Sequence, residues 1–363
     1  MTDYVKTRVA SRTGIITLDR PQALNSLSLD MVRALTATLL AWRADGGIDA
    51  VVIGSTSGKA LCAGGDIRFF HQAGSATPQT GSPLLDDFFT EEYALNHLIH
   101  FYPKPYIALM DGVVMGGGMG IAQGGPACRL RIVTERSKIA MPEVNIGLFP
   151  DVGASHFLSH ALGRLGHYLG VTGAAIGAAD AIHAGLADVF VPAAQLDALH
   201  ALVEATPGAD LPAAIRAFAA PFAPAAGASE LAAQRELIDR HFGADSVAAV
   251  MASLETDASP FAQQALAMMR LRSPLMMCVT REMLVRGAKL GMSDCLRMER
   301  ALVRRTFAHG EVIEGVRALV IDKDNAPRWN PPRLADVTPD MVAAFFAPVW
   351  PVHAHPLRGL RDA

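Results

Sequence analysis

Two glycine-rich segments lie where an apolar run typical of a buried strand changes into a helical pattern. They are ALCAGGDIRFF (60–70) and DGVVMGGGMGIA (111–122). Glycine allows backbone conformations closed to other residues, and it lets a ligand approach backbone N–H groups closely. A helix that begins there directs unpaired N–H groups and a partial positive charge towards whatever lies in front of it. Tight helix packing explains either segment equally well, so each segment alone leaves both interpretations open.

Two such sources of N–H groups facing one another would stabilise the negative oxygen that forms at a thioester carbonyl. A nucleotide site is a weaker interpretation. The segment STSGKALCAGGD (55–66) lacks the G-x-x-x-x-G-K-[ST] frame, and GGGMGIAQGG (116–125) has no acidic ribose partner at the usual distance. The sequence therefore predicts no dinucleotide cofactor.

The first half of the chain alternates short β-rich runs with turns and helical stretches, which predicts an α/β layered core. The segment SLDMVRALTATLLAWRADGG (28–47) has apolar residues at helical spacing and ends in glycines, as a capped helix does. Five runs have the residue types of buried strands: GIITLDR (14–20), DAVVIGS (49–55), PYIALM (105–110), RLRIVTE (129–135) and KIAMPE (138–143). We expect the last two runs to form a strand pair.

From about residue 190 the chain is Ala-rich and helical in pattern, with Pro-Ala segments typical of loops or linkers. From Pro260 to about Leu319 the pattern is almost wholly helical, and its spaced methionines indicate core packing. We therefore divide the chain into a core of residues 1–195, a helical insertion or linker region of residues 196–260, and a helical C-terminal region of residues 261–363.

Composition excludes several classes of protein. With 51% hydrophobic and 18% charged residues the chain is globular rather than disordered. The net charge of −3 gives no support to nucleic-acid or membrane-surface binding. The four cysteines form no C-x-x-C pair, the N-terminus lacks the apolar region of a signal peptide, and glycines interrupt the most apolar long window. We expect a cytoplasmic protein that binds neither nucleic acid nor a membrane.

The segment MPEVNIGLFPDVG (141–153) places Glu143 and Asp151 in an apolar run with no basic residue between them. Two carboxyl groups close together in an apolar pocket separate their pKa values, which leaves one as a base and the other as a proton donor. Either residue could instead cap a helix, since Asp151 precedes the helix-like VGASHFL. No third ligand follows the nearby histidines at zinc-like spacing, so no metal site is predicted.

Four segments resemble, in order and spacing, the crotonase (enoyl-CoA hydratase/isomerase) superfamily: TLDRPQALNSLS (17–28), CAGGDI (62–67), MDGVVMGGGMGIA (110–122) and MPEVNIGLFPDVG (141–153). The resemblance implies an α/β fold with a crotonase-like ββα spiral core in residues 1–195, here with an extended helical C-terminal region. It implies an acyl-CoA substrate and an oxyanion hole formed by the N–H groups of Gly65 and Gly117. CoA is then part of the substrate, and no separate cofactor is expected. The matched positions that would bind the substrate are Ala23, Leu24, Ala63, Asp66, Ile67 and Gly118.

The acidic positions differ from those of the hydratases, which hold water with two glutamates. This chain has Gly120 where the hydratases have the first glutamate, and Glu143 where they have the other one. Asp151 then becomes the second acid of the predicted site. Three segments instead resemble the 3-hydroxyisobutyryl-CoA hydrolase subfamily, although the usual DF before EGVRA is replaced by residues 311–313, EVI. They are LLDDFFTEEYALNHLIHFYPKPYIALMDG (84–112), AMPEVNIGLFPDVGASHFL (140–158) and EGVRALVIDKDNAPRWNP (314–331).

The second resemblance implies hydrolysis of a small 3-hydroxyacyl-CoA, as in valine catabolism. We expect Glu143 to be the base or nucleophile, Asp151 to position water or the 3-hydroxyl group, and Glu92 to support them. Glu92 lies in an acidic run, so a solvated helix face is its alternative. An enoyl-CoA hydratase, a dienoyl-CoA isomerase of the same superfamily and a non-catalytic acyl-CoA-binding subunit remain alternative functions. The superfamily resemblance also implies a homo-oligomer, either a trimer or a hexamer.

Overall fold

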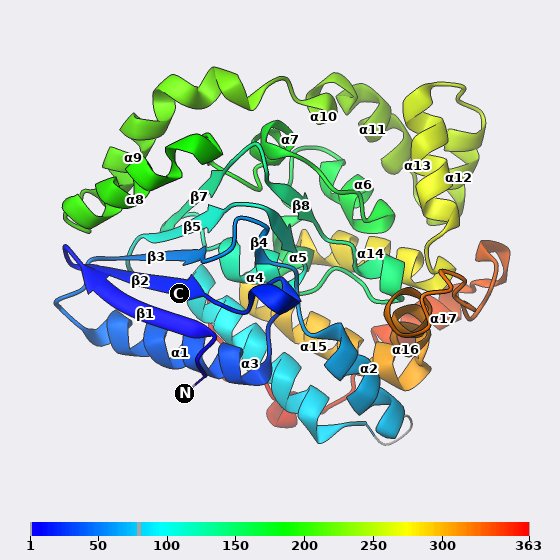
Figure 1. Ribbon diagram of the computed structural model, residues 1–363. Helices are drawn as coiled ribbons and strands as arrows, with labels where there is room; N and C mark the ends of the chain where they lie inside the picture. The colour runs from blue at the N-terminus through cyan, green and yellow to red at the C-terminus, as the bar shows by residue number, and fades with distance from the viewer. Residues whose placement is uncertain (1, 78–80, 363) are drawn as a thin grey trace.

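The computed structural model describes residues 2–77 and 81–362 (Figure 1). Its centre is a sheet in the order β1-β2-β3-β5-β7-β9, in which β1 and β2 run antiparallel and the other neighbours run parallel. A second, smaller sheet has the parallel order β4-β6-β8. The strands are β1 Val5–Ala10, β2 Thr13–Leu18, β3 Ala50–Ser55, β4 Ala60–Cys62, β5 Tyr106–Met110, β6 Val113–Met115, β7 Arg129–Val133, β8 Lys138–Ala140 and β9 Val189–Phe190.

A strand of the large sheet is followed by a strand of the small sheet and then by a helical segment, three times over. The chain runs from β3 to β4 and α2, from β5 to β6 and α4, and from β7 to β8 and a short 3₁₀ helix. This ββα repeat confirms the predicted fold class. The prediction that 129–135 and 138–143 pair with one another is wrong. Both form strands, but β7 pairs with β5 and β9 whereas β8 pairs with β6, because a turn at Thr134–Ser137 carries the chain from one sheet to the other.

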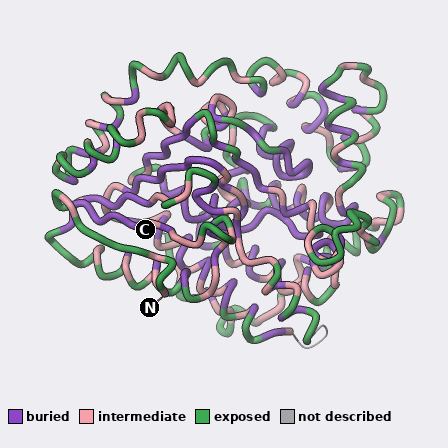
Figure 2. Tube along the Cα trace, viewed as in Figure 1, coloured by how far each residue is buried: buried purple, intermediate pink, exposed green. Residues whose placement is uncertain are grey.

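Both faces of the large sheet are buried at its central strands, as the nearly continuous apolar runs of β3 and β5 require, whereas the edge strand β1 is largely exposed. Val52 and Ile107 pack under α8 and α9, whereas Ile53 and Ala108 belong to the main core that includes α1 and α3. Figure 2 shows the burial concentrated on the central strands, with exposed residues along the outer helical arch. The predicted helix of residues 28–47 forms as α1, with the Ser28 hydroxyl accepting a hydrogen bond from Met31 N.

The C-terminal helices pack against the sheet-bearing part of the chain. Helix α14 contacts α5 and α6, α15 contacts α3 and α5, and α16 contacts α2. Their buried side chains belong to the same hydrophobic cluster as the strands. None of the helices in the described ranges is long and apolar enough to cross a membrane.

The helices have the following bounds: α1 Leu29–Ala44, α2 Ile67–Ala76, α3 Pro83–His100, α4 Gly117–Ala122, α5 Ala154–Phe157, α6 Leu165–Thr172, α7 Ala178–His183, α8 Leu196–Ala205, α9 Leu211–Ala219, α10 Glu230–Ala233, α11 Arg235–Phe242, α12 Val247–Glu255, α13 Pro260–Arg270, α14 Pro274–Gly287, α15 Met292–His309, α16 Glu311–Val316 and α17 Pro339–Phe345. A π-helical turn, Arg317–Ile321, extends α16, and a 3₁₀ helix covers Glu143–Ile146.

Candidate active site

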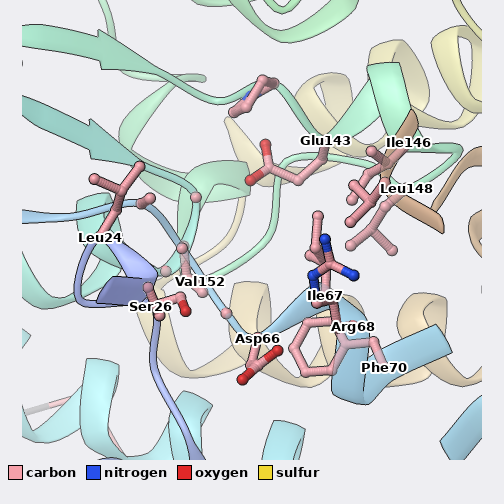
Figure 3. Close-up of a pocket in the computed structure, with 18 of the residues that line it drawn as sticks. Leu24, Ser26, Asp66, Ile67, Arg68, Phe70, Glu143, Ile146, Leu148 and Val152 are labelled. Carbon is pink, nitrogen blue, oxygen red and sulfur yellow. The ribbon is translucent and has the colours of Figure 1, made fainter. Parts of the chain in front are cut away.

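A cavity of about 570 Å³ opens where the segments that follow β2, β4, β6 and β8 come together. The volume is within the usual range for a small-molecule site. Helices α2 and α3 form one wall, and the π-helical turn supplies Leu319 and Val320. In Figure 3 the Glu143 carboxylate points into the space between Leu24 on one side and Ile146 and Leu148 on the other. The cavity therefore combines residues from both halves of the chain.

Two glycine amides meet in this cavity. Gly65 follows β4, and Gly117 begins α4, each directly after a glycine with positive φ. A Cβ built on Gly117 would lie 3.3 Å from Gly65 N, so the two turns approach closely. Within the described residues, neither N–H donates a hydrogen bond to a backbone or side-chain acceptor. These two N–H groups are available to a ligand.

Three carboxyl groups lie beside these amides. Glu92 on α3, Glu143 at the start of its 3₁₀ helix and Asp151 before α5 are 2%, 6% and 5% exposed. A Cβ on Gly117 would lie 2.7 Å from Glu92 Oε1, and one on Gly116 would lie 2.6 Å from Glu143 Oε1. The structure thus brings together the three acids that the sequence predicts.

The environments of the three acids differ. Glu92 Oε1 and Glu143 Oε2 are buried and have no hydrogen-bond partner in the described structure. Asp151 Oδ2 accepts a 2.6 Å hydrogen bond from the Tyr93 hydroxyl. A donor of this kind stabilises the ionised form of a carboxyl group, so it distinguishes Asp151 from the other two.

Burial shifts the pKa values of the three acids. Burial, followed by repulsion from Asp151, raises the pKa values of Glu92 and Glu143 well above the usual range. Burial also raises the pKa of Asp151, to about 6, but the Tyr93 hydroxyl opposes this rise. Three coupled acids share their protons, and the first to ionise is the one with a donor. Near neutral pH the group therefore contains an ionised Asp151 beside protonated glutamates.

The capping alternatives for these acids do not hold. The N-cap residue of α5 is Gly153 and has no side-chain cap, while the Asp151 side chain turns to Tyr93. The 3₁₀ helix that begins at Glu143 likewise has no side-chain cap. Glu92 is 2% exposed, so it does not lie on a solvated helix face.

The predicted substrate-binding positions divide into two groups. The cavity is lined by five of them: Ala23, Leu24, Ala63, Asp66 and Ile67. The sixth, Gly118, does not line it. Gly118 is buried, and a Cβ built on it would lie 2.1 Å from the Cys62 carbonyl oxygen, so there is no room for a side chain at this position.

Asparagine and valine side chains fill the place where hydratases carry their first glutamate. A Cβ built on Gly120 would lie 2.7 Å from Asn96 Nδ2 and 2.7 Å from Val152 Cβ. Asn96 lies one turn after Glu92 on α3, is 2% exposed, and neither its Nδ2 nor its Oδ1 has a partner among the described residues. There is no space at position 120 for a carboxylate.

The sequence reasoning missed several residues of the site. Tyr93 stands directly after Glu92 in the EEY segment, so its position was available, but only the structure shows where its hydroxyl points. Leu319 and Val320 come from the C-terminal signature and gave no sign of facing the cavity. Glu299, fully buried on α15, accepts hydrogen bonds from Gly153 N and Ser155 N. Nothing in the helical pattern around Glu299 distinguishes it from a surface glutamate.

The fold and this site define an enzyme of the crotonase type. A family model described as enoyl-CoA hydratase/isomerase matches residues 13–346, and the chain belongs to this family. It is 37% identical over 337 residues to the 3-hydroxyisobutyryl-CoA hydrolase of Rattus norvegicus, covering 92% of this chain and 86% of that protein. It is 38% identical over 345 residues to that of Xenopus tropicalis, covering 93% and 87%. The predicted resemblance to the superfamily and to this subfamily is confirmed.

Two solved structures are similar over almost their whole length. A carnitinyl-CoA dehydratase from Mycobacterium thermoresistibile has a TM-score of 0.87 at 38% identity, covering 96% of this chain and 98% of that one. An enoyl-CoA hydratase from Rhodobacter sphaeroides has a TM-score of 0.85 at 40% identity, with the same coverage. The names of the hydrolase relatives include the word mitochondrial, so the cytoplasmic location stays a prediction, as does the homo-oligomer.

Proposed function

We propose that the protein hydrolyses a small 3-hydroxyacyl-CoA thioester of the 3-hydroxyisobutyryl-CoA type, as in valine catabolism. The observation that carries the proposal is the group of three buried carboxyls beside two free amides, with no room for a carboxylate at Gly120. The relatives named as 3-hydroxyisobutyryl-CoA hydrolases support it, because they match more than nine-tenths of this chain.

The thioester carbonyl oxygen would accept hydrogen bonds from the N–H groups of Gly65 and Gly117. Attack on the carbonyl carbon places a negative charge on that oxygen, and two fixed donors in a dry site stabilise it strongly. Removing one donor of this kind typically costs about 10²–10³ in kcat. The two amides therefore serve as the oxyanion hole in this proposal.

The carboxyl groups would move the protons. Asp151 takes a proton from a water molecule as the water oxygen bonds to the carbonyl carbon. The carbon–sulfur bond then breaks, and the departing thiolate takes the proton held by Glu143, which gives a free acid and the CoA thiol. Transfer of the proton from Asp151 to Glu143 restores the starting state. Glu92, beside Gly117, is placed to hydrogen-bond the acyl group or the water.

This assignment makes Asp151 the base and Glu143 the acid, whereas the sequence alone led us to expect Glu143 as the base or nucleophile and Asp151 as the group that positions water or the 3-hydroxyl group. The Tyr93 hydroxyl supports it, because it favours the ionised form of Asp151, whereas Glu143 has no donor to its Oε2. Burial, followed by repulsion from Asp151, raises the pKa of Glu143, so Glu143 keeps its proton. One group is thus ready to accept a proton and the other to release one.

Hydration of an enoyl-CoA, or the reverse dehydration, is the second candidate function. The names of the two solved structures favour it, at 38% and 40% identity. The filled space at position 120 argues against it, because one of the two water-holding acids has no place. A non-catalytic acyl-CoA-binding subunit is disfavoured. Two buried carboxyl oxygens without hydrogen-bond partners lower the stability of the fold, and a protein that catalyses no reaction would have no use for them.

Purified protein and a panel of CoA thioesters test the proposal. Thiol release is measured with 3-hydroxyisobutyryl-CoA and with isobutyryl-CoA, a matched control that lacks the hydroxyl group, while loss of the enoyl chromophore is followed with crotonyl-CoA. We expect thiol release from the first, less from the second, and no hydration of the third. Hydration of crotonyl-CoA without thiol release from either saturated thioester would refute the proposal and favour the hydratase alternative.

A further inference from the structure

Helix α15 contacts two elements next to the acid group, which consists of Glu92, Glu143 and Asp151: these elements are α3, which carries Glu92, and α5, which follows the Asp151 turn. Two adjacent residues of α15, Glu299 and Arg300, are 0% and 1% exposed. Charged side chains are almost never fully buried unless they are paired or hydrogen-bonded. The contacts of these two buried side chains therefore indicate what they do.

The Glu299 carboxylate holds the turn that follows Asp151. Its Oε2 accepts a 2.8 Å hydrogen bond from Gly153 N, and its Oε1 accepts from Ser155 N at 2.9 Å and from Ser155 Oγ at 2.5 Å. The turn needs holding, because Val152 has a φ of 55°, a conformation that β-branched residues rarely adopt. Such strain persists only where the surroundings over-determine it.

The Arg300 guanidinium holds the other element, helix α3. Its Nε donates to Thr90 Oγ1 at 2.9 Å, and its Nη2 donates to Asp86 Oδ1 at 2.6 Å. The following residues of α3 include Glu92 and Tyr93, so the helical segment that Arg300 fixes carries one member of the acid group and the tyrosine that donates to Asp151.

We propose that Glu299 and Arg300 are positioning residues that hold the Asp151 turn and helix α3 at the separation at which Tyr93 meets Asp151. Because Glu299 and Arg300 are adjacent residues of one rigid helix, they hold the Asp151 turn and helix α3 relative to one another. A movement of the turn or of α3 would therefore change the 2.6 Å hydrogen bond between Tyr93 and Asp151. Glu299 and Arg300 lie in the helical C-terminal region, which thereby becomes part of the acid site of the core. The kinetic consequence of this inference rests on the proposed function; the structural consequence does not.

Hydrogen exchange read by mass spectrometry tests the structural consequence without any substrate. Glu299→Gln replaces one acceptor oxygen with an NH₂ group, which faces an N–H donor whichever way the amide is turned. We expect faster exchange, by roughly tenfold, in peptides that cover residues 151–158. Arg300→Lys keeps the charge but loses the forked geometry, and should speed exchange in residues 86–97 instead.

A matched control is available in Glu311→Gln. The Glu311 side chain is also buried, at 2% exposed, and accepts hydrogen bonds from Ser273 Oγ and Asn330 N, neither of which belongs to helix α3 or to the Asp151 turn. It should lower the unfolding temperature as Glu299→Gln does, but leave exchange in residues 151–158 unchanged. If all three variants change exchange uniformly, or if Glu299→Gln leaves residues 151–158 unchanged, the positioning role is refuted.

Steady-state kinetics test the functional consequence with whichever CoA thioester the wild-type protein turns over. Misplacing a catalytic group by about 1 Å can cost on the order of 10²-fold. We expect Glu299→Gln and Arg300→Lys to lower kcat by about 10–100-fold with KM within about threefold, because the CoA-side residues lie on other loops. Glu311→Gln should keep kcat. Normal kcat in all variants would overturn the inference, whereas a wild type that releases no thiol would count against the proposed function alone.

Discussion

The hydroxyl group of Tyr93 controls the ionisation of Asp151, and Tyr93→Phe isolates its effect. The hydroxyl donates a 2.6 Å hydrogen bond to a carboxylate that is 5% exposed, while the ring itself packs in the core. A hydrogen bond to a charged group contributes about 1.5–3 kcal/mol. Since about 1.4 kcal/mol corresponds to one pH unit, the substitution should raise the pKa of Asp151 by about 1–2 pH units.

The direction in which Tyr93→Phe changes the activity follows from the pKa of Asp151. Burial already raises the pKa of Asp151 to about 6, so its ionised form predominates in the wild type only above that pH. The substitution removes the donor that opposes this rise, and the ionised base then forms only at higher pH. We expect the acidic limb of kcat/KM to move up by about 1–2 pH units, with near-normal activity recovered by about pH 9.

The assay is thiol release from the acyl-CoA substrate between pH 5 and 9, for wild type, Tyr93→Phe and Tyr102→Phe. The Tyr102 hydroxyl is the control, because it is also buried but donates to Leu39 O, away from the acid group. Tyr102→Phe should leave the profile where it is. A uniform loss of activity at every pH in Tyr93→Phe, or an acidic limb that moves downwards, would refute the reasoning.

Three further substitutions test the other parts of the site. Glu143→Gln should lower kcat by about 10²-fold and, because burial raises the pKa of Glu143, should make the protein more stable than wild type at pH 9 in urea denaturation; equal stability at that pH would count against a strained carboxylate. Gly117→Ala keeps the backbone N–H but places a methyl group 2.7 Å from Glu92 Oε1, so it should displace the amide or Glu92 and reduce kcat by about 10²-fold while circular dichroism stays native; near-normal kcat would show that the reaction does not depend on the position of either group. Gly120→Glu should cost about 1–3 kcal/mol of stability, because Asn96 occupies the space, and should show no hydration of crotonyl-CoA; a gain of hydratase activity would contradict this account.

The local part of the fold was accessible from sequence. The β-branched and apolar runs of β2, β3 and β5 and the helical periodicity of α1 are short-range patterns, and the structure forms them with small differences at the ends. The relation between β7 and β8 was not accessible. Both are short apolar runs separated by a turn, and nothing local shows that they enter different sheets. Strand pairing is a long-range property, which the turn residues alone do not determine.

The candidate site, like the fold, has a part that local sequence motifs predict and a part that they do not. Glu143, Asp151 and the two glycine turns carry recognisable local motifs, and the structure gathers them around one cavity. The Glu299 contact joins residues 144 positions apart in the chain, and a glutamate in a helical pattern carries no mark of its burial. Gly118 shows the opposite case, because it does not line the cavity, and a motif glycine that lines a cavity and one that packs on a neighbouring strand look alike in sequence.

Within the described residues no Lys, Arg or His side chain forms an ion pair with Glu92, Glu143 or Asp151, and Arg20 at the cavity edge is paired to Asp66 instead. A cation among the three acids would lower their pKa values and stabilise the fold. It would also leave all three ionised at neutral pH, with no proton for a departing thiolate. The proposed chemistry therefore requires three buried acids without a cation, which is less stable than the same acids with a cation among them. The hydrogen bonds from Tyr93 and to Glu299 keep the three acids in place.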